Sequence, residues 1–184
     1  MITSTHLGFG VGSDCRRKRS VASHNCCDPA LPPEAIIMQM VMGGWVARAI
    51  SDVSRLNIPD ALKASGPMSA AELVANGLDA NPQALERVMR ACASMGLFTE
   101  DASGKFGPTE RSDVLTKGSP MSVKVLAQEV GGTWLSLWSQ LMEGIKTGEP
   151  QTRKVFGMEW WDYFLRKTES SYTAKDWTMV PFSL

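Results

Sequence analysis

The sequence predicts a mainly α-helical chain that carries one short β-hairpin. Three observations support this: a long apolar stretch at residues 35–50, two helices with clear start and stop signals between residues 69 and 96, and two short strand-like runs after them. The length of 184 residues suits one domain with a sizeable core. We expect that domain to span residues 32–167, between a disordered tail at 1–31 and a divergent or truncated tail at 168–184.

The composition argues against several classes of partner. Nineteen Lys and Arg residues balance nineteen Asp and Glu residues, so the net charge provides no general affinity for nucleic acid or for acidic membranes. No apolar run approaches the ~20 residues that a membrane-spanning helix needs. We therefore expect a cytoplasmic protein that binds neither nucleic acid nor a membrane.

The cysteines do not have the spacing of a metal site. Two of them are adjacent, no C-x-x-C pair occurs, and only His6 and His24 are available as further ligands. We expect no metal site, and we interpret all four residues as reduced thiols: Cys15, Cys26, Cys27 and Cys92.

The segment GFGVG at residues 8–12 has the glycine spacing of a cofactor-binding loop. Such a loop needs a buried strand before it and a helix after it, and neither MITSTHL nor SDCRRKRS has the pattern for these elements. We interpret GFGVG as a chance match. The basic run at 16–19 belongs to the same solvated tail, with an organellar transit peptide or a nuclear signal as alternatives.

Residues 35–50 are predicted to form a helix that is apolar nearly all round, since only Gln39 and Arg48 are polar. A helix of this kind cannot lie on the surface of a small monomer, because it would leave a large apolar face in water. It must be enclosed by its own domain or by another subunit, and the second possibility suggests a dimer. The residues expected at the dimer interface are Ile36, Ile37, Met40, Val41 and Trp45.

Two capped helices are predicted next. Ser69 and Glu72 match the S-x-x-E capping box, and Gly77 after Asn76 provides a left-handed stop. Asn81 followed by Pro82 starts the second helix, which ends at Gly96. Its inward face is expected to hold Leu85, Val88, Met89 and Cys92.

Two short strands, Leu97 to Glu100 and Lys105 to Pro108, are predicted to form a hairpin with a Ser-Gly turn. Two helices followed by a hairpin predict a winged helix. DNA-binding winged helices carry basic or amide side chains on the second helix and basic residues on the wing. Here the second helix offers Gln83, Glu86, Arg87 and Arg90, and the wing offers Glu100, Asp101 and Lys105, so a DNA-binding regulator is the weaker alternative.

The C-terminal part is predicted to be helical and aromatic. A continuous stripe is expected to lie in the core: Trp134, Leu137, Trp138, Leu141 and Ile145. The segment VFGMEWWDYFLRK then places five aromatic residues within nine positions, which are Phe156, Trp160, Trp161, Tyr163 and Phe164. This density exceeds what a core helix of that size needs, so some of these rings are expected to face something outside the domain.

The order of these segments resembles the N-terminal region of small-molecule O-methyltransferases, which include plant phenolic, hydroxyindole and bacterial carotenoid or antibiotic enzymes. The resemblance covers about residues 33–166 and is carried jointly by SRLNIPDALKASGPMSAAELVANGLDANPQALERVMRACASMGLF, WSQLMEGIKTGEP and FGMEWWDYF. It implies a winged-helix dimerisation domain, entwined with a second copy, that also covers the substrate pocket. In that family, S-adenosylmethionine binds a separate C-terminal domain.

The resemblance implies that four aromatic residues face a small aromatic substrate: Trp134, Phe156, Trp160 and Tyr163. Flat apolar rings can sandwich an aromatic acceptor, and a phenol hydroxyl can bond its polar edge. The alternative interpretation is that all four are core or dimer-interface residues.

The chain alone is predicted to be inactive, with no catalytic and no cofactor-binding residue of its own. Asp162 is expected to be a solvated or capping carboxylate, and residues 168–184 show no strand, glycine loop or acidic partner for a cofactor. The sequence thus predicts a dimerisation and substrate-capping domain whose partner is an identical chain or a full-length relative. A free-standing dimeric binding protein for small molecules is a further alternative.

Overall fold

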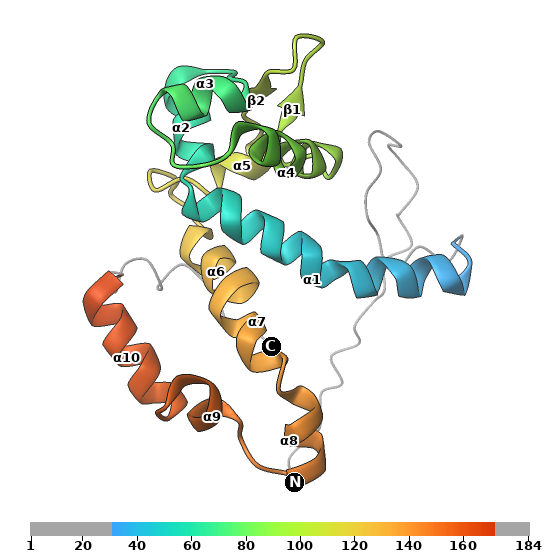
Figure 1. The fold of residues 1–184 in the computed structure, drawn as a ribbon, viewed down its shortest axis with the longest axis vertical. Coiled ribbons are helices and arrows are strands. Elements are labelled where there is room, and N and C mark those ends of the chain that lie inside the picture. Colours follow the sequence, from blue (N-terminus) through green and yellow to red (C-terminus); the bar gives the residue numbers. More distant parts are fainter. Residues whose placement is uncertain (1–30, 172–184) are drawn as a thin grey trace, which may run out of the picture.

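The computed structural model describes residues 31–171, with side chains described through residue 166. The chain is mainly helical with one small sheet, as predicted (Figure 1). The elements in order are α1 (Pro33–Arg55), α2 (Ile58–Ser65), α3 (Ala70–Ala75), α4 (Pro82–Ser94), β1 (Thr99–Glu100), β2 (Phe106–Gly107), α5 (Glu110–Asp113), α6 (Lys124–Gln128), the π-helix η1 (Glu129–Thr133), α7 (Trp134–Trp138), α8 (Leu141–Thr147), α9 (Thr152–Phe156) and α10 (Trp160–Ser171).

Both chain ends extend beyond this description. Residues 1–30 and 172–184 lie outside the described residues, so the expected tails are not tested for most of their length. The same holds for the GFGVG segment, for the basic run at 16–19, and for Cys15, Cys26, Cys27, His6 and His24.

Helix α1 is longer than the predicted range of 35–50. It starts at Pro33, where a fixed φ and a missing amide suit the first helical turn, and it ends at Arg55, whose charge complements the helix C-terminus. The chain then turns at Asn57, which has a φ of 56° and precedes α2. The sequence analysis did not predict α2 as a separate helix.

The predicted caps of α3 and α4 are confirmed. The Ser69 amide donates to the Glu72 carboxylate at 2.7 Å, and the Glu72 amide donates to the Ser69 hydroxyl at 3.2 Å. Gly77 has a φ of 96°, which is the left-handed conformation expected at the stop. Asn81 accepts from the amides of Gln83 and Ala84 at the start of α4.

The hairpin forms, but its strands are shorter than predicted. β1 and β2 pair antiparallel, with Thr99 opposite Gly107 and Glu100 opposite Phe106. Leu97 and Phe98, which the sequence assigned to the first strand, are instead buried below the hairpin. The Leu97 amide donates to the Cys92 carbonyl at 3.0 Å, and the Leu97 carbonyl accepts from the Thr109 hydroxyl at 2.7 Å, so its backbone groups are used outside the ladder and the pairing starts only at Thr99.

The core lies between the C-terminal part of α1, the helices α2 to α4 and the hairpin. It consists of Val53, Ile58, Leu62, Met68, Ala70, Leu73, Leu85, Met89, Cys92, Leu97, Phe98, Phe106 and Leu115. Of the face predicted for α4, Leu85, Met89 and Cys92 are buried, whereas Val88 is exposed. Val88 instead lines a groove between α1 and α4.

A close helix crossing joins α1 to η1. A β-carbon on Gly131 would overlap the carbonyl oxygen of Ala47 and would lie 2.7 Å from Cβ of Ser51. The Ser51 hydroxyl donates to the carbonyl oxygen of Gln128 at 3.0 Å, and the Gln128 side-chain amide donates to the carbonyl oxygen of Ser54 at 3.1 Å. Only glycine allows this approach, because the two backbones are in contact.

A buried cation joins α6 to α2. The Lys124 ammonium donates to Asn57 Oδ1 at 2.7 Å and to Asp60 Oδ2 at 2.5 Å, and its side chain is 6% exposed. The Lys117 amide donates to the other oxygen of Asp60. Burial raises the pKa of Asp60, but the bonds and charges of Lys124 and Lys117 outweigh this effect and hold the pKa below its ordinary value.

The C-terminal helices contradict one expectation. The stripe from Trp134 to Ile145 was expected to be core, but Trp138, Leu141 and Ile145 are exposed. The helix breaks after Trp138, so the stripe is divided between α7 and α8. Figure 1 shows α8 and α9 beyond α7 on the side away from the hairpin, and α10 running back to the level of α6.

We predict that Gly131→Ala lowers the free energy of unfolding by about 2 kcal/mol, because the new methyl group overlaps backbone of α1 and forces the crossing apart. The matched control is Gly144→Ala in α8, where the nearest atom would lie at 3.6 Å and alanine raises helix propensity by up to about 1 kcal/mol. Urea denaturation at one fixed protein concentration measures both. Equal effects of the two substitutions would contradict the crossing geometry.

We predict that Asp60→Asn destabilises the chain by about 3 kcal/mol at neutral pH, because it leaves the Lys124 charge buried without its counter-ion. The folded-state pKa of Asp60 is lowered, so its contribution is present above the ordinary carboxyl pKa and is lost as the pH falls. The difference between wild type and variant should therefore shrink below about pH 4. Urea denaturation of both proteins from about pH 3 to pH 7 measures the difference in their free energies of unfolding. If this difference does not change with pH, the ion pair is not its cause.

Candidate functional site

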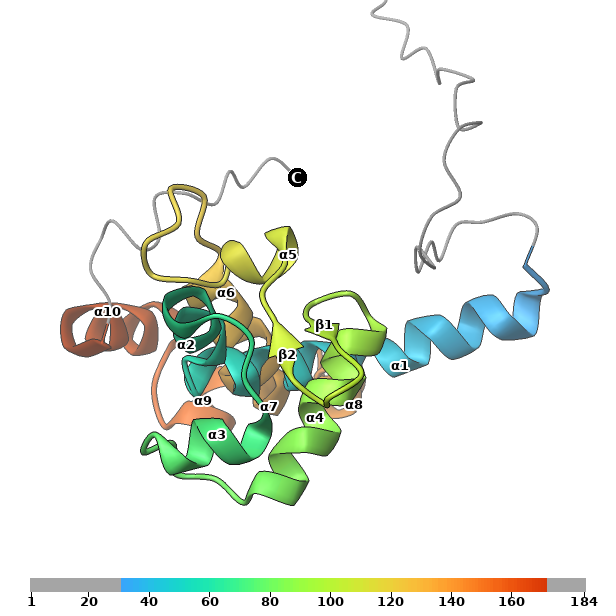
Figure 2. The ribbon, with the colours of Figure 1, turned by 90° about the horizontal axis from the view of Figure 1, so that it is seen from above.

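The N-terminal half of α1 projects beyond the rest of the described chain, as both views show (Figures 1 and 2). We call residues 33–46 the arm. Among the residues predicted for a dimer interface, Ile36 is half-buried and the other four are exposed: Ile37 by 59%, Met40 by 55%, Val41 by 69% and Trp45 by 70%. The described part of the chain therefore does not enclose this half of the helix.

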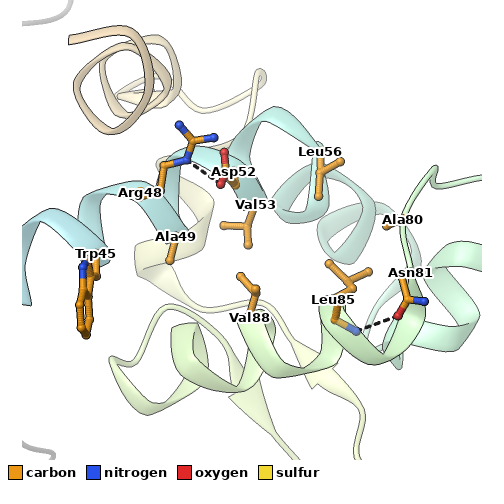
Figure 3. A pocket seen from close by; sticks show the side chains of 11 residues that line it. Trp45, Arg48, Ala49, Asp52, Val53, Leu56, Ala80, Asn81, Leu85 and Val88 are labelled. Atoms are coloured by element: carbon orange, nitrogen blue, oxygen red, sulfur yellow. Dashed lines mark hydrogen bonds and ion pairs between the residues drawn. The ribbon is translucent and has the colours of Figure 1, made fainter. Parts of the chain in front are cut away.

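An apolar groove runs between α1 and α4, beginning where the arm ends (Figure 3). Its volume is about 450 Å³. Val53 from α1 points toward Leu85 and Val88 from α4, and Trp45 stands at one end. On α1, Arg48 and Asp52 form an ion pair at 2.8 Å beside this apolar lining. We call this cavity the α1–α4 groove.

A larger cavity of about 730 Å³ lies on another side of the arm, against the core end of the hairpin, α5 and α6. Met40 and Val46 line it from α1, and Leu115 lines it from beyond α5. Gln39 also lines it, and its Oε1 atom is buried without a hydrogen-bond partner among the described residues. Arg111 of α5 also lines this cavity. Its guanidinium donates a hydrogen bond to the Met95 carbonyl oxygen at 2.8 Å.

Sequence patterns indicate one of these last two lining residues, Gln39, but not the other, Arg111. Gln39 was noted only as one of two polar residues in the apolar stretch, and Arg111 was not singled out. A lone amide within an apolar helix is a usable signal, because a buried amide needs a partner. Arg111 gave no such signal, since it follows the hairpin in a polar segment and reaches the cavity only through the fold.

The four aromatic residues implied by the family resemblance lie together. Trp134 of α7 contacts Trp160 of α10 edge to face, with ring centroids 5.4 Å apart. Phe156 at the end of α9 lies 6.4 Å from Trp160, and Tyr163 lies 6.3 Å from Trp160. We call these four residues the aromatic cluster. Three helices that are separate in sequence thus converge on one set of half-buried rings.

One pair within the aromatic cluster is closely stacked. The rings of Phe156 and Tyr163 have centroids 4.2 Å apart and are inclined by 15°. The neighbouring Trp161 lies outside the cluster, is 70% exposed and contacts Phe164 edge to face at 6.3 Å. Asp162 is exposed, as expected for a solvated carboxylate.

The helix–hairpin region presents paired charges. The Arg90 guanidinium binds Glu86 at 2.7 Å and Glu100 at 3.1 Å, and these carboxylates raise the pKa of Arg90. Lys105 on the hairpin binds Glu72 at 2.6 Å. Two cations of this surface, Arg90 and Lys105, are thus paired with carboxylates of the same chain.

The described residues were also compared with the requirements of a metal site, a membrane-spanning helix and a reactive cysteine. Within residues 31–171, no three His, Cys, Asp or Glu side chains are grouped so that they could hold a metal ion. None of the helices described there combines the length and apolarity needed to cross a membrane. Burial raises the pKa of the Cys92 thiol to about 11, so this side chain is an inert thiol at neutral pH.

Comparison with known proteins identifies the fold. The family model for the O-methyltransferase dimerisation domain matches residues 38–118. The chain is 33% identical over 141 residues to the phenazine O-methyltransferase PhzM of Lysobacter antibioticus, which covers 77% of this chain and 41% of that protein. It is 34% identical over 131 residues to the O-demethylpuromycin-O-methyltransferase of Streptomyces alboniger, covering 71% of this chain and 34% of that protein.

Solved structures agree. The crystal structure of LaPhzM superposes with a TM-score of 0.69 at 32% identity, covering 76% of this chain and 41% of that one. Human N-acetylserotonin methyltransferase in complex with SAM superposes with a TM-score of 0.64 at 26% identity, covering 78% of this chain and 43% of that one.

The chain spans between about a third and about two fifths of the length of these relatives. The apolar arm, the capped helices and the family match agree with each other and confirm the resemblance predicted from the sequence. Residues 38–118 belong to the O-methyltransferase dimerisation domain family, whose members here are S-adenosylmethionine-dependent methyltransferases of small molecules.

Proposed function

We propose that residues 32–167 form the dimerisation and substrate-capping unit of an S-adenosylmethionine-dependent O-methyltransferase that acts on a small aromatic or polyketide-like hydroxyl compound. The observation that carries this proposal is the uncovered apolar arm within a region that belongs to a dimerisation family. The order of two capped helices and a hairpin supports the winged helix that we propose for this fold, with association as its use. The cytoplasmic location expected from the sequence stays a prediction.

The arm supports self-association on energetic grounds. Five large apolar side chains of the arm are more than half exposed, and burying each one contributes roughly 1.5–3 kcal/mol relative to water. The arm is anchored at its C-terminal end by the crossing with η1, so it cannot fold back to cover itself. A second copy provides apolar surface of the same kind, and the α1–α4 groove and the cavity beside Gln39 offer apolar surface on either side of the arm.

The partner is an identical chain, or a full-length relative in a mixed dimer. Gln39 does not favour either partner, because its Oε1 atom is already covered by this chain. Both kinds of dimer use the same residues of this chain, and co-expression with a full-length relative distinguishes them.

The aromatic cluster supports the capping role. Its rings come from α7, α9 and α10 (Figure 1). Apolar rings exclude water and orient a flat acceptor, and the phenol of Tyr163 offers a polar edge. These are the contributions that we assign to this chain: binding, orientation and shielding of the acceptor.

Methyl transfer requires more than these contributions. A base must take the hydroxyl proton and a donor must be held in line with the acceptor oxygen. The two histidines of the chain, His6 and His24, are outside the described residues, and Asp162 is exposed. We therefore assign turnover to the whole enzyme, in which S-adenosylmethionine binds another domain, and we expect residues 31–171 alone to be inactive.

We predict that Val41→Glu converts a dimer to a monomer, raising the dissociation constant at least about 30-fold. The substitution is compatible with the monomer, where Val41 is 69% exposed, but it buries an unpaired charge in the interface. Sedimentation velocity over a range of concentrations measures it. Met142→Glu on α8 is the matched control, with 64% exposure and no place on the arm. A wild-type chain that stays monomeric at high concentration would refute the dimerisation role.

We predict that Trp160→Ala weakens the binding of umbelliferone, a planar hydroxylated aromatic compound, about 10-fold, because the cluster loses its central ring. Energy transfer from tryptophan to the bound probe measures the affinity. Trp161→Ala is the matched control, since that ring lies outside the aromatic cluster. If the two variants bind equally, the cluster is structural and the capping role fails.

A further inference from the structure

The stacked pair of Phe156 and Tyr163 has the geometry of a ligand complex. Their rings are 4.2 Å apart and inclined by only 15°, whereas the other contacts within the aromatic cluster are longer or more inclined. A flat aromatic ligand bound by stacking would lie at about this distance and angle on the Tyr163 ring. Phe156 therefore covers the ring face that a planar acceptor would use.

Phe156 is carried by a short element between two glycines. α9 has five residues, and it lies between Gly148 and Gly157, which both have a φ of 72°. Glycine adopts this left-handed conformation without strain, and it also reaches the other backbone regions easily. Gly157 directly follows α9, and Gly148 ends α8 three residues before the N-cap of α9, so the chain can change direction at low cost at these two glycines.

α9 packs against α7 and α10 through Thr152, Val155 and Phe156. Thr152 is buried and Phe156 is half-buried, while Arg153 and Lys154 face the solvent. Arg153 forms an ion pair with Glu159 across Gly157, but both side chains are more than half exposed. Ion pairs at this exposure contribute little, and the stack of Phe156 on Tyr163 is the closer of the two ring contacts that Phe156 makes with α10.

We propose that Phe156 occupies the acceptor's place on Tyr163 and is displaced when the acceptor binds, with α9 moving as a flap on Gly148 and Gly157. This inference rests on the proposed role of the aromatic cluster and refines the part assigned to Phe156. Trp134 and Trp160 form the fixed wall, because their edge-to-face contact does not involve Phe156. Tyr163 is the stacking face, and Phe156 is a competitor of the ligand.

The proposal limits the class of ligand. A compound that displaces a phenyl ring from Tyr163 must present a flat aromatic ring of its own, since a saturated ring cannot recover the stacking that is lost. The acceptor is therefore a planar aromatic compound of at least one ring. Bulky substituents above the ring plane would meet the indole of Trp160.

The test compares umbelliferone binding by the wild-type chain, Phe156→Ala and Phe156→Leu. Removing the competing ring should tighten binding about 3- to 10-fold, which corresponds to about 0.7–1.4 kcal/mol. Phe156→Leu keeps apolar volume at this position and should tighten binding in the same direction, so the test stands even where the alanine variant folds poorly. Trp161→Ala, outside the cluster, should match wild type.

The direction in which the Phe156 substitutions change the affinity for umbelliferone decides whether Phe156 is a competitor of the ligand or an ordinary contact residue. If Phe156 is an ordinary contact residue, both substitutions weaken binding, as Trp160→Ala does, and the competitor role is overturned while the capping role survives. If neither Trp160→Ala nor the Phe156 variants change the affinity, or if no variant binds the probe, the proposed function fails together with this inference. Tighter binding by both Phe156 variants, with weaker binding by Trp160→Ala, supports both proposals.

Discussion

The architecture depends on the contact of two helix backbones at Gly131. This contact fixes the C-terminal half of α1 against η1, and the hydrogen bonds among Ser51, Gln128 and Ser54 hold the crossing in one arrangement. Because an α-helix is stiff over this length, fixing one half also fixes the direction of the other. The arm is thereby held away from the core, and its apolar side chains are available to a second chain.

The same crossing also directs the C-terminal helices. η1 continues into α7, so the position of Trp134 follows from the way in which Gly131 meets α1. From there the aromatic cluster is the principal apolar contact that gathers α9 and α10. The proposed dimer interface and the proposed substrate-facing rings are thus attached to opposite sides of one helix junction, which explains why one small domain can serve both roles.

An element was predictable from the sequence when the residues that stabilise it are close neighbours in the chain. Ser69, Gly77 and Asn81 were assigned correctly because a cap involves only residues two or three positions away. The hairpin was found but made too long, since the burial of Leu97 and Phe98 depends on core helices distant in sequence. The stripe through Trp138 and Ile145 was wrongly assigned to the core, because periodicity identifies an apolar face without identifying what covers it.

The sequence by itself determined the helical class, the caps, the hairpin and the family resemblance, together with the expectation that the helix at residues 35–50 must be enclosed by its own domain or by another subunit. Those features depend on the spacing and hydrophobicity of residues that lie close together in the sequence. Tertiary structure decided which half of α1 is uncovered, that Gln39 and Arg111 share a cavity, and that Phe156 stacks on Tyr163. These contacts join residues from separate elements, so their geometry exists only once the helices have packed.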